Sequence, residues 1–158
     1  MPVPRTSPML VAPEHLMIDG FHSATLAFRG WLAEVLPAHG LGPAQFFTLS
    51  DIAEHGPLNA AHLASYRCVS PPAVSVVVDD LVRTGWVERR RSEKDRREVV
   101  LTLTSSGQKL LAELWQEIGH RMAKATAAIP RKDLETTARV LTSLAIPSGA
   151  SLGSGSLA

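Results

Sequence analysis

The sequence predicts a mainly α fold (α+β) with one two-stranded hairpin, and three observations predict it. Apolar residues recur at helical spacing near both ends of the chain. Residues 57–85 contain the capping residues, proline and glycine that are typical of two short helices joined by a turn. Residues 83–104, RTGWVERRRSEKDRREVVLTLT, read as two strands joined by a tight, strongly basic turn. Together they predict a winged helix-turn-helix with a two-stranded basic wing and flanking N- and C-terminal dimerisation helices.

The first predicted helix, within residues 14–37, carries a heptad-like apolar seam that Pro37 and Gly40 end. Its members follow steps of three and four residues: Ile18, Phe21, Thr25, Phe28, Leu32 and Val35.

The helix-turn-helix is indicated by its capping residues. Asn59 can cap the first helix, and residues 67–69 form the turn. Ser70 is a candidate N-cap, Pro71 suits the first helical position, and Gly85 suits the position after the helix end. The helical spacing turns Val74, Val77, Val78 and Leu81 to the core and Pro72, Ser75, Val76, Asp79 and Arg83 away from it.

The basic hairpin stands out electrostatically. Residues 83–97 hold seven basic and three acidic side chains, a local charge of +4, whereas the rest of the chain has 9 basic and 12 acidic residues. One positive element on an otherwise slightly acidic chain favours a polyanion as partner. A solvated hairpin tip is the alternative interpretation.

Two further amphipathic segments follow within residues 105–146, the first ended by Pro130 and the second starting near Arg131. Three flanking helices have more apolar surface than a small reading core needs, so we expect part of it to meet a second subunit; the alternative is that they close one core. The apolar positions are Leu111, Leu114, Ile118, Met122, Ala125 and Ile129, then Leu134, Ala138, Leu141 and Ala145.

Over roughly residues 16–146 the chain resembles the multiple-antibiotic-resistance regulator (MarR) family. The segments HGPLNAAHLA, VSPPAVS, TGWVERR and DRREVVLTLTSSG carry the resemblance in the family's order and spacing, with Asp95 and Arg97 in the wing and Leu103, Thr104 and Gly107 after it. The resemblance implies a homodimeric transcription regulator whose first and last helices interlock. It also implies a repressor that a small molecule of aromatic or phenolic type releases from a near-palindromic operator.

The predicted contacts with double-stranded DNA come from the helix pair and the wing. Arg97 can enter a narrow minor groove; Asp95 could hold that guanidinium or, alternatively, form the turn. Val76 could meet a thymine methyl group. Asp80 and Val76 stand where many relatives are basic, which leaves open a winged-helix dimer that serves as a protein-interaction module. The candidates are Asn59, Ser70, Pro71, Pro72, Ser75, Val76, Arg91, Lys94, Asp95, Arg96 and Arg97.

A small-molecule effector could bind between the dimer helices and the reading domain, where the resemblance implies a crevice. Each candidate is an equally good core residue. The candidates are Phe28, Trp31, His39, Phe46 and Phe47.

Catalytic and metal chemistry is not indicated. The six histidines lack metal-ligand spacing, and no nucleophile elbow or phosphate-binding glycine loop is present, so we expect neither an enzyme nor a cofactor. Cys68, the only cysteine, is interpreted as a small apolar residue; the alternative is a thiol-responsive regulator that senses through it.

One domain, residues 14–146, is predicted, with the winged helix-turn-helix at 43–104. Residues 1–13 are expected to be a flexible arm and residues 147–158 a flexible tail. No apolar run reaches the roughly 20 residues of a membrane span, and we expect a cytoplasmic protein.

Overall fold

The computed structural model describes residues 12–67, 69–93 and 95–144. These form helices and a single two-stranded antiparallel sheet, which confirms the predicted fold class. In chain order the elements are α1 (Pro13–Val35), the 3₁₀ helix η1 (Leu36–His39), α2 (Pro43–His55), α3 (Ala60–Tyr66), α4 (Pro71–Arg83), β1 (Val87–Arg91), β2 (Val99–Leu103), α5 (Ser105–Ala125) and α6 (Arg131–Ser143).

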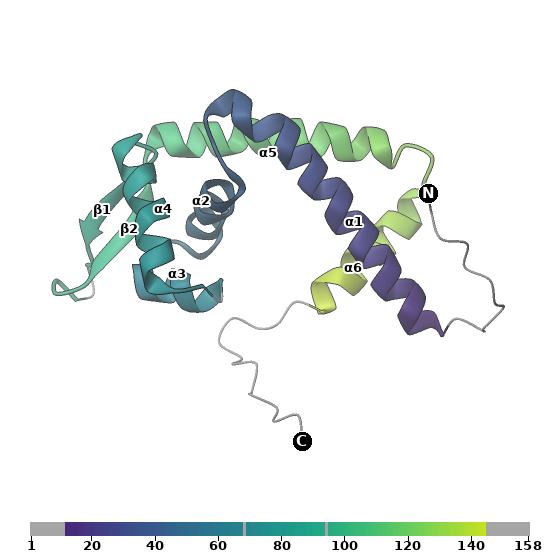
Figure 1. The fold of residues 1–158 in the computed structure, drawn as a ribbon, viewed down its shortest axis with the longest axis horizontal. Helices are drawn as coiled ribbons and strands as arrows, with labels where there is room; N and C mark the ends of the chain where they lie inside the picture. The colour runs from purple at the N-terminus through teal and green to yellow at the C-terminus, as the bar shows by residue number, and fades with distance from the viewer. Residues whose placement is uncertain (1–11, 68, 94, 145–158) are drawn as a thin grey trace, which may run out of the picture.

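The molecule is elongated, with the hairpin at one end and α6 at the other (Figure 1). Helix α5 runs along one side and joins the two ends, while α2, α3 and α4 gather next to the hairpin (Figure 1). Among the described residues, no helix combines the length and apolar character that crossing a membrane requires.

The core lies where α2, α4 and α5 converge with the ends of α1 and α3. Phe46, Leu63, Leu81 and Leu114 are completely buried there. The predicted core face of α4 is confirmed, since Val74, Val78 and Leu81 are buried and Val77 packs against them partly buried. Burial of such side chains stabilises by roughly 1.5–3 kcal/mol each, so this cluster anchors the helix-turn-helix.

The predicted helix ends are mostly confirmed. Asn59 caps α3, since its side-chain oxygen accepts a hydrogen bond from the His62 backbone N–H at 2.7 Å. Pro71 starts α4, and Gly85 follows its end with φ of 77°, a conformation that favours glycine. Ser70 occupies the N-cap position, but its hydroxyl makes no capping hydrogen bond, so the cap is positional only.

The hairpin differs from the predicted tight turn. Strands β1 and β2 pair in register from Val87↔Leu103 to Arg91↔Val99 and are joined by residues 92–98, a longer connection. The backbone N–H of Ser92 donates to the Glu98 carbonyl at 2.9 Å, which closes this connection one step beyond the strands. A long basic tip therefore projects from a short ladder.

The predicted end of the last-but-one helix was wrong. Helix α5 ends at Ala125, because Thr126 already departs from helical geometry, and Ile129 lies beyond the helix instead of continuing its apolar face. Helix α6 begins at Arg131 as predicted. Ala145 lies outside the described residues.

The flanking helices leave much apolar surface uncovered. Only Leu32 and Val35 of α1 are buried, and α6 has no buried residue. The exposed apolar side chains of this uncovered surface are Leu16, Met17, Ile18, Phe21, Leu26, Met122, Ile129, Val140, Leu141 and Leu144.

Candidate nucleic-acid interface

The exposed face of α4 begins at its N-terminus. Pro71, Pro72 and Ser75 are exposed there, and Val76 has 66% of its surface accessible. The face therefore offers short, uncharged side chains that a groove could accommodate closely.

The two carboxylates on α4 are each paired with an arginine of the same chain. Asp79 lies 2.5 Å from the Arg89 guanidinium of β1, and Asp80 lies 2.8 Å from that of Arg83. Both pairs are exposed, so each contributes little to stability. Each arginine compensates the negative charge of its carboxylate. Neither acid would therefore repel a polyanion that approached this face of α4.

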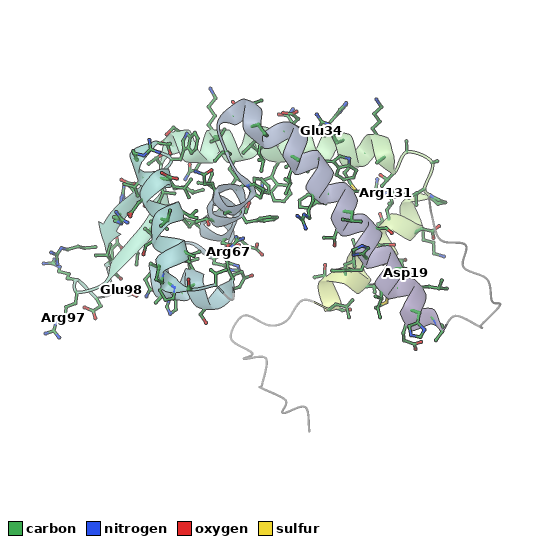
Figure 2. The ribbon with its side chains drawn as sticks, in the orientation of Figure 1. Asp19, Glu34, Arg67, Arg97, Glu98 and Arg131 are labelled. Carbon is green, nitrogen blue, oxygen red and sulfur yellow. The ribbon has the colours of Figure 1, made fainter. Side chains whose placement is uncertain are left out.

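The tip of the wing is arranged around Asp95. Its carboxylate accepts the backbone N–H of Arg97 at 2.9 Å, which is the turn-forming role that the sequence left open. The Arg97 side chain extends outward at the tip (Figure 2). Arg91 donates to the Arg96 carbonyl at 2.9 Å. Lys94 lies outside the described residues.

Glu98 was missed by sequence reasoning. It follows the tip and accepts a hydrogen bond from the side-chain amide of Asn59, the residue that caps α3. The two residues are 39 positions apart, so no local signal in the sequence links them. Asn59 is thereby held on both sides of its amide group.

The root of the wing is fixed to the start of α5. The hydroxyl groups of Thr104 and Ser106 donate to the Gly85 carbonyl at 2.7 and 3.0 Å. Gly107 packs so tightly that an added Cβ would lie 2.1 Å from the Trp86 carbonyl oxygen. These contacts account for the threonine and the glycine of the leucine-threonine-x-x-glycine element.

The end of α3 is fixed by Arg67. Its guanidinium lies 2.9 Å from the Asp51 carboxylate of α2 and 5.2 Å from the centre of the Phe47 ring. Burial raises the pKa of Asp51, and the hydrogen bond and charge of Arg67 oppose that rise only in part. These contacts hold the first helix of the pair against α2. Cys68, which follows Arg67, lies outside the described residues.

The five candidate ligand residues fall into two groups. Phe28, Phe46 and Phe47 form a chain of aromatic contacts, with ring centres 6.4 Å apart for Phe28 and Phe47 and 5.3 Å for Phe46 and Phe47. Phe46 is fully buried and belongs to the core. Trp31 and His39 are partly exposed, and His39 lies 3.7 Å from the Glu117 carboxylate.

No group of three or more histidine, cysteine, aspartate or glutamate side chains is placed to hold a metal ion in the part of the chain that the structure describes.

A helix pair whose first helix is capped by Asn59, followed by a projecting basic hairpin, defines the class of winged-helix DNA-binding proteins. The comparisons with known proteins narrow that class. A model described as the MarR family matches residues 41–99. The HTH-type transcriptional regulator FarR of Neisseria gonorrhoeae is 31% identical over 133 residues, which cover 84% of this chain and 91% of FarR.

Similarity to two other proteins supports the same assignment. The HTH-type transcriptional repressor MdtR of Bacillus subtilis is 28% identical over 72% of this chain and 74% of its own. The reduced form of MarR from E. coli superposes with a TM-score of 0.66 at 25% identity, covering 80% of this chain and 93% of that one. The chain belongs to the MarR family of transcription regulators.

Proposed function

We propose that this protein is a sequence-specific, double-stranded DNA-binding regulator that acts as a homodimeric repressor in the cytoplasm. The observation that carries the proposal is the pairing of Asp79 and Asp80 with arginines beside an exposed, uncharged helix face and an outward Arg97. Relatives lend support: MdtR is named a repressor, and a mutant MarR from E. coli of the same fold was crystallised with operator DNA.

Each part of the interface has a distinct role in this proposal. Helix α4 enters the major groove, with Pro71, Pro72 and Ser75 at its leading end and Val76 against a thymine methyl group. The wing places Arg97 in the adjacent minor groove. Arg91, Lys94 and Arg96 contact phosphates, Asp95 shapes the tip, and Asn59 anchors α3.

The homodimer follows from the uncovered apolar surface. Side chains such as Phe21 and Ile18 on α1, together with Leu141 on α6, are between 42% and 63% exposed in a single chain. Large apolar patches of this kind are rare on monomeric proteins. A two-fold dimer would bury them and would place two reading units on the half-sites of a near-palindrome.

A small aromatic or phenolic effector is part of the proposal. The residues we assign to it are Phe28, Trp31, His39 and Phe47, with Trp31 and His39 at the accessible edge; Phe46, the fifth candidate, lies buried in the core behind Phe47 and would support the pocket without lining it. The two subunits would have one spacing that fits the operator and another that does not. Such a ligand would release the operator only to the extent that it binds the second arrangement more tightly than the first.

The test is binding of the purified protein to the DNA upstream of its own gene, and to DNA selected from a random pool, over a range of salt concentrations. We expect tight binding that weakens steeply with salt, since phosphate contacts release counterions. Arg97→Ala should weaken it strongly. Arg131→Ala removes an exposed arginine of α6, far from the wing, and is the charge-matched control (Figure 2).

Failure of both DNA sources, with the dimer intact, would overturn the proposal in favour of a protein-interaction module. A change in binding when Cys68 is oxidised, absent in Cys68→Ser, would instead establish the thiol-responsive regulator.

A further inference from the structure

The side chain of Asn59 makes two contacts that point in different directions. Its oxygen accepts the His62 backbone N–H and so caps α3. Its amide nitrogen donates to a carboxylate oxygen of Glu98 in the wing. Serine, threonine and aspartate also cap helices, but of these four residues only asparagine carries the acceptor for the cap and an N–H donor for a carboxylate on separate atoms.

Glu98 stands where the wing leaves the body of the protein. It lies between the exposed Arg97 and strand β2, and it is only partly exposed. Next to it, Leu58 and Leu101 exchange two backbone hydrogen bonds, of 3.3 and 2.8 Å, in an isolated bridge. The segment before α3 is thus joined to the wing twice, by backbone hydrogen bonds to strand β2 and by the side-chain pair of Asn59 and Glu98.

Apolar packing does not fill the space on this side of the wing. A hollow of about 570 Å³ opens between the two parts and is lined by residues of both, among them His62, Arg90 and Glu98. A strand pair standing over a hollow can tilt more easily than one packed on a core. The base of the wing is packed, since Val87, Val100 and Leu101 are buried, whereas its outer part at Arg90 and Glu98 is held on this side by polar contacts.

We propose that Glu98 is a positioning residue for DNA binding: through Asn59 it fixes the angle between the wing and the helix-turn-helix. It touches no DNA itself. This proposal rests on the proposed function, because the angle matters only if the wing and α4 must reach adjacent grooves together.

Exchanging the two partners provides a sharp test. Asn59→Asp keeps the cap, since aspartate caps as well as asparagine, but sets two carboxylates against each other. Glu98→Gln keeps an acceptor for Asn59. In the double variant Asn59→Asp/Glu98→Gln, the amide of the new glutamine can donate to the new aspartate, and the net charge equals that of the wild type.

The first readout needs no DNA. Backbone hydrogen exchange of residues 88–101 is measured in the free protein, with peptides of α2 as internal reference. We expect faster exchange in Asn59→Asp and wild-type rates in Glu98→Gln and in the double variant. Equal rates in all four proteins, or fast exchange in the double variant as well, would overturn the pairing.

The second readout uses duplex DNA selected by the wild-type protein. Asn59→Asp should bind roughly tenfold more weakly, a change comparable to one hydrogen bond to a charged group, with a shallower salt dependence, and the double variant should recover both. In Asn59→Asp, adding Arg97→Ala should cost less than it does in the wild type. Unchanged binding in Asn59→Asp would overturn the positioning role.

The two failures are distinguishable. If the wild type selects no DNA, the proposed function fails, and the exchange rates still decide whether Glu98 and Asn59 hold the wing. If the wild type binds DNA and the exchange of partners has no effect, only the role of Glu98 is overturned.

Discussion

The Arg89 guanidinium lies 2.5 Å from the Asp79 carboxylate, so the first strand of the wing neutralises an acid on α4, the helix that we propose to enter the major groove. Both side chains are substantially exposed, at 45% and 64%. Exposed pairs of this kind contribute roughly 0–1 kcal/mol to stability. Their main consequence is that the outer face of α4 presents less negative charge to DNA.

Removal of Arg89 should therefore weaken DNA binding, because the carboxylate of Asp79 loses the positive charge that compensates it. We expect Arg89→Ala to reduce affinity roughly tenfold, since a bare carboxylate then faces phosphates. Asp79→Asn/Arg89→Ala should recover most of that loss in the same titration. A double variant as weak as Arg89→Ala would mean that Arg89 acts by its own contacts with DNA.

Gly107→Ala should destabilise the fold. The added Cβ would lie 2.1 Å from the backbone oxygen of Trp86, so either α5 or the segment just before β1 must shift. Overpacking of this kind costs about 1–3 kcal/mol, measurable as a lower urea midpoint. Gly119→Ala is the control in the same helix: nothing lies within 4 Å of its Cβ, and alanine is the better helix former. A midpoint for Gly107→Ala equal to that of Gly119→Ala would contradict the close approach.

Asp51 should make stability depend on pH in an unusual direction. Its pKa is raised above the ordinary 3.8, mainly by burial, so the folded protein binds this proton more tightly than the unfolded chain does. Lowering the pH through the interval between the two pKa values increases the stability that this group contributes, and raising it reverses the gain.

The comparison with Asp51→Asn isolates this effect, because other titrating groups cancel between the two proteins. The unfolding free energy of the wild type minus that of the variant should increase as the pH falls from about 7 toward 4. Urea unfolding at several pH values measures it. A difference that moves toward the variant instead would mean that Arg67 outweighs the burial.

Phe21→Asp should separate the proposed dimer. Phe21 is 58% exposed on α1, and a charge there cannot be buried cheaply against a second subunit. Sedimentation velocity should show monomers, and DNA binding should weaken with them. A second variant, His22→Asp, tests the same surface, because it adds the same charge at the next position, which is also exposed. If both variants sediment like the wild type, this face of α1 lies outside the dimer contact.

Local features of the fold could be predicted because their causes are local. Asn59, Pro71 and Gly85 each act on the backbone within a turn of their own position, so their identities alone marked the helix ends. The apolar spacing of α4 likewise identified its buried face. The end of α5 could not be found this way, since Ile129 continues the apolar spacing after the backbone has left the helix.

The candidate site was predictable as a set of side chains and not as a set of contacts. Periodicity placed Asp79 on the outer face of α4 but could not say that Arg89 would meet it there. Asp95 and Arg97 were predicted as neighbours, yet only the backbone geometry decides that the carboxylate accepts an N–H instead of the guanidinium. Glu98 has no signature because its partner is far away in the chain.

The junction at Gly85 has a mechanical consequence. Since two hydroxyl groups from the start of α5 hold its carbonyl, and Gly107 leaves no space beside Trp86, the root of the wing cannot slide relative to that helix. Helix α5 has 21 residues and is therefore about 31 Å long. If α5 turns as a rigid rod about this junction, a displacement of roughly 3 Å at its far end corresponds to a rotation of about 5°, and the root of the wing turns with it.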